Sequence, residues 1–215
     1  MTKKKKQAIL LSAIALVAII LVGTTLAYFT DTDAKQNVFT IGNVTGSLNE
    51  KKDGKDTKDD SSSTGFTYDN VKPGDSLDKE PYVELGSTSQ DAYARIKVTV
   101  SGDLDAAHMA DVLNGLTGTE AGWYKVAIDD TSCYFYYQNV LSNKTGGATK
   151  TSYVFTKVNI PSETWGNEVS NKTFKIDVVG DLIQADNFTP VKDANGNIIG
   201  WNNSDGTAVT IENAK

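Results

Sequence analysis

Nine residues, Ala92–Val100, alternate between apolar and polar side chains, and this run does most to limit the folds open to the chain. In an extended segment Ile96 and Val98 fall on one face, while Arg95 and Lys97 fall on the other. Alternation with a period of two is typical of a β-strand that has one buried and one solvated face. The run therefore predicts a half-buried strand of an antiparallel sheet.

Other short segments rich in β-branched and aromatic residues follow along the chain. Strands are expected at residues 38–40, 43–48, 82–85, 92–100, 123–128, 133–140, 153–160, 172–179 and 181–189. Near the C-terminal end, Asn195-Gly196 between Val191 and Ile198 predicts a type I′ hairpin. Strands at this spacing favour an antiparallel β-sandwich, and the fold class predicted is all-β.

Three other segments are expected to lie outside the strands. Leu104–Leu116 has apolar residues at helical spacing and predicts one short helix, with Asp103 or Asp105 as its N-cap. Residues 49–64 are rich in Lys, Asp and Ser and hold no bulky apolar side chain, which predicts a solvated polar loop. Val71–Asp75 contains Pro-Gly and predicts a turn.

The N-terminus has the pattern of an export signal. Lys3–Lys6 form a cationic region, and an apolar run that contains one serine, Ser12, follows from Ala8 to Val22. Small residues at Thr25 and Ala27 suit the narrow pocket of a signal peptidase, so cleavage is expected after Ala27, with Tyr28 as the new N-terminus.

The alternative is a retained membrane anchor, because a helix of about 20 apolar residues can span a bilayer and the stretch Ala8–Phe29 nearly reaches that length. Cleavage is favoured because the apolar core has the length of a signal-peptide core. The expected organisation is a signal peptide over 1–27, an N-terminal arm over 28–42 and a sandwich domain over 43–215.

Charge and cysteine content narrow the partners and the compartment. The sequence holds 21 basic and 27 acidic residues, four of the lysines lie in the signal, and the mature net charge is about −10. Such a surface repels nucleic acid and anionic lipid, so no nucleic acid is expected, and membrane contact is expected only through the uncleaved signal. Cys133 is the single cysteine, is expected as a buried core thiol, and suits secretion by Gram-positive or anaerobic bacteria.

The residue types give catalysis little support. A zinc hydrolase needs three protein ligands and an open position, but His108 is the single histidine and no His-Glu-x-x-His occurs. His108 is expected to be a helix residue partly packed on a surface, and no catalytic residue, metal ligand or cofactor is predicted. Calcium needs only clustered oxygens, which occur at Asp31 and Asp33, at Asp129 and Asp130, and at residues 193–197, although turn chemistry is favoured there.

A series of motifs resembles the TasA/camelysin family of Gram-positive bacteria, whose precursors are cut by the dedicated signal peptidase SipW. The motifs are Leu26–Asp33, Asn37–Gly42, Val71–Asp75, Tyr93–Val100, Trp123–Tyr124, Tyr134–Tyr137 and Ile183–Phe188. The resemblance implies a jelly-roll β-sandwich, a signal helix and the role of a protein subunit of biofilm matrix fibres. Some family members are described as surface metalloproteases, but this chain lacks the histidines for that activity, so an enzyme is not expected.

The predicted function is therefore that of a secreted structural protein of the cell surface or extracellular matrix, which self-associates into fibres by strand addition. The arm freed at Tyr28 is the expected donor strand, with Tyr28, Phe29, Val38 and Phe39 as its anchors. Other matrix or anchoring proteins are further candidate partners. The alternative, that the arm is the first strand of its own domain, stays open. A second class of function is a monomeric adhesion or glycan-binding module that uses Trp123, Trp165 or Trp201 as stacking platforms.

Overall fold

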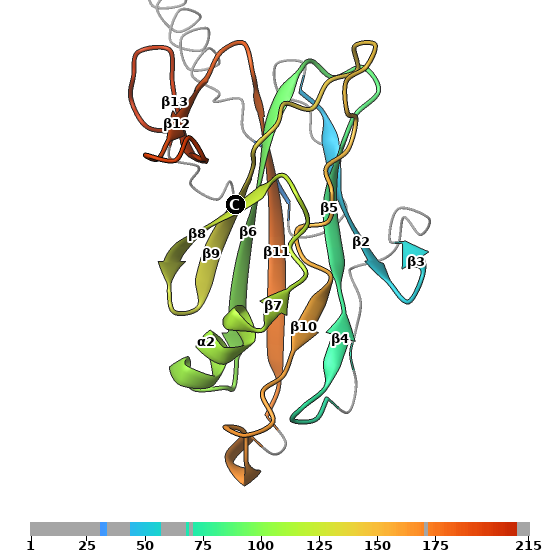
Figure 1. The fold of residues 1–215 in the computed structure, drawn as a ribbon, viewed down its shortest axis with the longest axis vertical. Helices are drawn as coiled ribbons and strands as arrows, with labels where there is room; N and C mark the ends of the chain where they lie inside the picture. Colours follow the sequence, from blue (N-terminus) through green and yellow to red (C-terminus); the bar gives the residue numbers. More distant parts are fainter. Residues whose placement is uncertain (1–30, 34–43, 57–67, 69–70, 170–171, 210–215) are drawn as a thin grey trace, which may run out of the picture.

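In the computed structural model, antiparallel sheets and one short helix account for most of the residues described, which are 31–33, 44–56, 68, 71–169 and 172–209. The largest sheet has five strands in the order β1-β11-β6-β9-β8 (Figure 1). Their bounds are β1 Asp31–Asp33, β6 Ala92–Gly102, β8 Trp123–Asp129, β9 Ser132–Tyr137 and β11 Phe174–Gln184. Every neighbouring pair in this sheet is antiparallel, as the sequence predicts.

The alternation of residues 92–100 is confirmed in β6. Ala94, Ile96 and Val98 are buried in the main core, while Lys97 on the other face is half-buried. Arg95 departs from this pattern, because its side chain is buried although it belongs to the polar face. The reason is a second layer over that face, which residues 92–100 alone do not indicate.

Two smaller antiparallel sheets pack against the inner face of the large one, in the orders β3-β2-β5 and β4-β10-β7. Their strands are β2 Gly46–Lys52, β3 Lys55–Asp56, β4 Ser76–Asp78, β5 Glu80–Leu85, β7 Leu116–Thr117 and β10 Lys157–Asn159. Leu48, Val83 and Val158 from these sheets share one buried cluster with Ile96 and Val98. The core therefore lies between the large sheet and the two small ones.

The two strands predicted at 172–179 and 181–189 are one continuous strand, β11, which ends at Gln184. Gly180 lies in the middle of it, opposite Ile96 in the register. A Cβ at Gly180 would lie 3.4 Å from the Cβ of Leu48, so the missing side chain allows the facing sheet to approach closely. The glycine that breaks the sequence pattern thus marks sheet packing rather than a turn.

The polar loop predicted over 49–64 is wrong for its first part. Residues 49–52 belong to β2, and a two-residue turn at Asp53-Gly54 connects β2 to β3. Both turn residues have positive φ, at 49° and 77°, which is the backbone of a type I′ hairpin turn. The strand was missed because its side chains are polar; residues 57–64 of the predicted loop lie outside the described residues.

The helix α2 spans Ala106–Asn114, within the predicted range, and lies beside β6 and β7 (Figure 1). Asp105 is its N-cap and accepts a hydrogen bond from the His108 backbone amide at 3.0 Å. Val112 and Leu113 are its buried residues. A single helical turn of 3₁₀ type, η2 (Asn167–Val169), faces α2 from the segment that precedes β11.

The C-terminal hairpin is confirmed, but its predicted turn type is wrong. Strands β12 (Thr189–Lys192) and β13 (Ile198–Asn202) pair antiparallel. Gly196 has a φ of 85° and donates its amide to the Asp193 carbonyl at 3.0 Å, while Asn195 does not have positive φ. These features indicate a type I turn followed by a glycine bulge. The hairpin packs over the outer face of the large sheet, where Ile198 and Trp201 are buried.

Candidate functional site

The edge of the large sheet formed by β1 and β11 is the part of the structure that bears on the predicted arm. Asp31, Thr32 and Asp33 pair antiparallel with Leu182, Asp181 and Gly180. The predicted cleavage residues Thr25, Ala27 and Tyr28 and the anchors Phe29, Val38 and Phe39 lie outside the described residues. The structure thus brings one short part of the arm, only a few residues beyond the predicted cleavage point, onto the edge of a sheet.

β1 covers a small part of the strand it joins. It pairs with three of the eleven residues of β11, and along residues 174–179 β11 has no strand on that side within the described part of the chain. The other neighbour of β11 is β6, which pairs along its full length. An edge of this kind presents backbone N–H and C=O groups that can pair with an added strand.

A buried ion pair lies directly behind this edge. Arg95 Nε donates to Asp181 Oδ2 at 2.7 Å, and the two side chains are 5% and 3% exposed. Arg95 Nη1 also donates to the Tyr136 hydroxyl at 3.1 Å. Its guanidinium lies 4.1 Å from the centre of the Tyr134 ring and 5.1 Å from that of Trp201. Asp181 is also the register partner of Thr32, so the pair stands one strand away from the arm.

The charge of Arg95 is maintained by its neighbours. Burial alone would lower the pKa of Arg95, but the Asp181 carboxylate together with Tyr136 and Tyr134 outweighs it, and the pKa lies above its ordinary value. The sequence did not predict this pair, because Arg95 lies on the face of the alternating pattern that is expected to be solvated. The signal that could have found it is the gathering of Tyr134 and Tyr136 on the same face, under a hairpin that carries Trp201.

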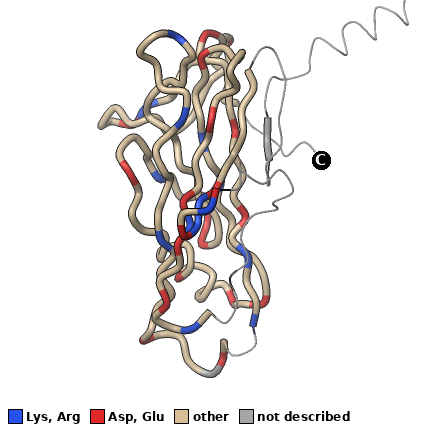
Figure 2. The backbone as a smooth tube through the Cα atoms, turned by 90° about the vertical axis from the view of Figure 1, so that its right-hand side faces the viewer, with Lys and Arg blue, Asp and Glu red and all other residues tan. Residues whose placement is uncertain are grey.

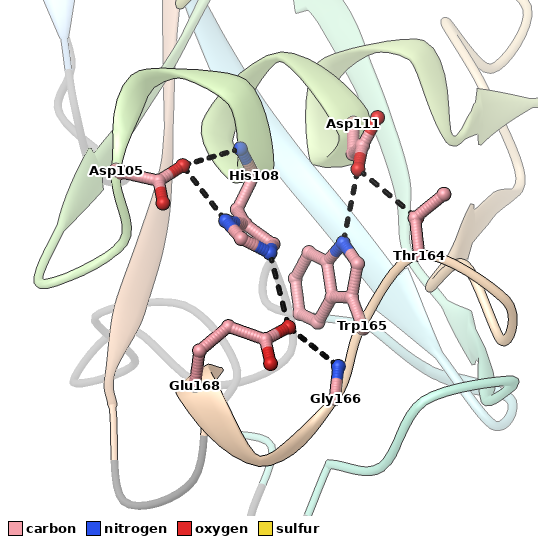
Figure 3. A network of polar contacts seen from close by, with 7 residues as sticks. All are labelled: Asp105, His108, Asp111, Thr164, Trp165, Gly166 and Glu168. Atoms are coloured by element: carbon pink, nitrogen blue, oxygen red, sulfur yellow. Dashed lines mark hydrogen bonds and ion pairs between the residues drawn. The ribbon is translucent and has the colours of Figure 1, made fainter.

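A second polar network joins α2 to the segment before β11 (Figure 3). His108 Nδ1 lies 2.7 Å from Asp105 Oδ1, and His108 Nε2 lies 3.5 Å from Glu168 Oε1. The His108 side chain is 13% exposed and meets Trp165 edge to face at 5.5 Å. The expectation of a helix histidine packed at a surface is confirmed, and the contacts of both ring nitrogens are with carboxylates rather than with a hydroxyl or thiol.

Cys133 is the buried core thiol that the sequence predicts. It is fully buried in β9, and burial raises its pKa to about 11. A thiol with so high a pKa is protonated at neutral pH and is a poor nucleophile. The described residues therefore hold no pairing of His108 with an activated thiol.

Two of the three oxygen-rich segments considered for calcium use a carboxylate to close a turn, while the side chains of Asp31 and Asp33 lie outside the described part of the structure. Asp193 Oδ1 accepts from the amides of Asn195 and Asn197, and Asp129 Oδ1 accepts from the amide and hydroxyl of Thr131. This is the turn chemistry that the sequence favours. Among the described residues no three His, Cys, Asp or Glu side chains gather as ligands of a metal ion.

The tryptophans proposed as glycan platforms do not serve that purpose. Trp123, Trp165 and Trp201 are 8%, 7% and 3% exposed, so their ring faces are covered by protein. Their indole groups are held inside, since Trp123 Nε1 donates to the Ser152 carbonyl and Trp165 Nε1 to Asp111. A stacking platform needs an exposed ring face, and this basis for a glycan-binding module is therefore wrong.

The charges of the described surface are mixed. In the view of Figure 2, Asp and Glu are interspersed with Lys and Arg along the length of the chain. No helix in the described part of the chain is long and apolar enough to cross a membrane. The predicted signal segment, 1–27, lies outside that part.

Comparison with known proteins found no matching family model, no matching curated protein and no matching solved structure. The resemblance to the TasA/camelysin family thus rests on the sequence motifs alone.

Proposed function

We propose that this chain is a secreted structural subunit that assembles into fibres of the cell surface or extracellular matrix by adding its N-terminal arm to a neighbouring copy. The observation that carries the proposal is the pairing of Asp31–Asp33 with the edge of β11. In its finer form the proposed fold is a jelly-roll sandwich, which agrees with a core enclosed between antiparallel sheets.

The exchange of this strand between copies needs no new interface. The edge of β11 that pairs with β1 of its own chain offers the same backbone groups to β1 of another copy, as in other strand exchanges. Ten residues separate Asp33 from Val44, and an extended segment of ten residues spans at most about 35 Å. This reach allows the arm to extend from its own domain to a neighbour.

The direction of assembly follows from the positions of donor and acceptor. Each copy can donate its arm to the β11 edge of the next copy, and this head-to-tail use produces an open filament rather than a closed ring where the rotation between copies does not close. While the signal is attached, the arm is held at the membrane. A signal peptidase of the SipW type would free Tyr28 and thereby start assembly, and other matrix or anchoring proteins would join the fibre afterwards.

The test compares the mature chain, residues 28–215, with a form that begins at residue 41. Size-exclusion chromatography and electron microscopy of both should give filaments from the first and monomers from the second. Thr32→Pro removes one β1 amide donor and should shorten the filaments, while Thr32→Val retains that donor and serves as the matched control.

Addition of a peptide with the sequence of residues 28–40 to the truncated form distinguishes strand donation from nonspecific association. The peptide should bind in trans with one site per domain, and a peptide of scrambled order should not. Filaments of equal length from the truncated form would refute the arm as donor. A stable monomer of the mature chain at high concentration would refute the fibre role.

A further inference from the structure

The only histidine of the chain connects two elements that have no backbone pairing with each other. Asp105 is the cap of α2, and His108 and Asp111 lie in its first two turns (Figure 3). His108 and Asp111 contact the segment 164–168, and Asp105 contacts His108. On the other side, Asp111 Oδ2 accepts from Trp165 Nε1 at 3.1 Å and from the Thr164 hydroxyl at 3.3 Å. The segment 164–168 is therefore held on α2 by side chains.

The two carboxylates around His108 are held in their ionised forms. The pKa of Asp105 is lowered by the hydrogen bond from the His108 amide, and that of Glu168 is lowered by the hydrogen bond from the Gly166 amide at 2.6 Å. An ionised carboxylate can only accept hydrogen bonds. Both neighbours of the imidazole are thus acceptors.

The protonation of the imidazole decides whether both contacts are favourable. At 2.7 Å from Asp105, Nδ1 carries a proton in either form of the ring. In the imidazolium form Nε2 also carries a proton and is attracted to Glu168. In the neutral form Nε2 presents a lone pair to the Glu168 carboxylate, and that contact becomes repulsive.

We propose that His108 is a pH-sensitive latch that holds the segment 164–169 on α2 when the imidazole is protonated and loosens it when the imidazole is neutral. Histidine is the side chain that ordinarily changes charge between about pH 5 and 8, the range that an exported protein meets. The charged groups around His108 are the carboxylates of Asp105 and Glu168. The charge of Lys172 contributes to the lowered pKa of Asp105, and the Asp111 carboxylate accepts the hydrogen bond of Trp165 Nε1.

The latch acts close to the strand that accepts the arm. Segment 164–169 leads along the chain into β11, which begins at Phe174. Thr173, just before β11, is held separately by Asp103, which accepts its hydroxyl at 2.7 Å. Loosening is therefore expected to be confined to segment 164–169, so it does not depend on the proposed fibre role.

The test is amide hydrogen exchange in the full mature chain, expressed as protection relative to an unstructured peptide at the same pH, so that the intrinsic pH dependence cancels. The amides to follow are those of Gly166 and Val169, which donate to Glu168 Oε1 and to the Gly166 carbonyl. Their protection should fall about threefold to tenfold between about pH 5.5 and about pH 8, the effect of losing one charged contact. In Glu168→Gln the change should be less than about twofold, because the charge that distinguishes the two ring forms is gone.

Glu163→Gln is the matched control, since it removes one exposed negative charge from the same connection and should behave as the parent chain does. As the single histidine, His108 can also be read directly by nitrogen NMR, and at about pH 8 its proton should reside on Nδ1. Equal protection at both pH values, an equal change in Glu168→Gln, or a proton on Nε2 at the higher pH would each overturn the proposal.

Discussion

Removal of one partner of the buried Arg95–Asp181 pair should strongly destabilise the domain. In Asp181→Asn the guanidinium stays buried, 5% exposed, with its carboxylate replaced by a neutral amide. A charge that loses its ionic partner inside a protein costs about 3–5 kcal/mol, whereas an exposed pair contributes about 1 kcal/mol or less. The ring contacts with Tyr134 and Trp201 remain in the variant, so the lower end, about 3 kcal/mol, is expected.

Urea unfolding of the mature domain, followed by tryptophan fluorescence, measures this loss. With a slope of about 2 kcal/mol per molar urea, a loss of 3 kcal/mol lowers the midpoint by about 1.5 M. Arg95→Met should cost a similar amount. The double variant Arg95→Met/Asp181→Leu should cost less than the sum of its own two single variants, Arg95→Met and Asp181→Leu, because an apolar pair leaves no buried charge. A loss below about 1 kcal/mol in Asp181→Asn, or additive losses in the two single variants, would show that Arg95 does not depend on a buried ionic partner.

Three further predictions concern single features of the fold. Gly54→Ala should lower the free energy of unfolding by about 1 kcal/mol or more in urea titrations, because Gly54 has a φ of 77°. Gly200→Ala is the control for glycine replacement as such, since Gly200 lacks positive φ and an added Cβ would lie 3.6 Å from Val191, an ordinary contact; an equal loss in both variants would contradict the explanation. Cys133 should react with a thiol reagent only after unfolding; rapid reaction of the native chain would contradict its burial. Hydrogen bonds from the His108 amide and the Asn197 side chain lower the pKa values of Asp105 and Asp193. Both ionised carboxylates therefore stabilise the folded state above the ordinary carboxyl pKa of about 4, and this contribution should be lost as the pH falls from that value through the lowered pKa values. A urea midpoint that stays constant down to about pH 2 would contradict this.

Local patterns predicted those elements whose side chains follow one rule. The alternation in residues 92–100 predicted β6, and the capping residue Asp105 before an apolar period predicted α2. Both signals depend on contacts within a few residues along the chain. The strand and the helix that these signals predict therefore form whatever packs around them.

Other features depend on residues that are distant in sequence. The sequence pattern predicts a strand break at Gly180, but this residue packs against Leu48 of the facing sheet. The same kind of pattern predicts a solvated Arg95, but the C-terminal hairpin covers that face of the sheet. The sequence pattern also did not predict the turn types, since Asp53-Gly54 forms a type I′ turn and Asn195-Gly196, where that turn was predicted, does not. At the candidate site, the sequence predicted an arm with apolar anchors, whereas the described pairing is made by the acidic residues Asp31 and Asp33 with Thr32.

The exchange of β1 between copies is tested most directly by solid-state NMR on filaments grown from an equal mixture of two preparations, one labelled with ¹⁵N and the other with ¹³C. Contacts between the two labels can arise only between different copies. Exchange of β1 predicts such contacts between residues 31–33 and residues 180–182, in the antiparallel register of β1 and β11. If these contacts appear in filaments of a single preparation that carries both labels but are absent from the mixed filaments, β1 pairs with β11 of its own copy, and exchange of β1 is contradicted.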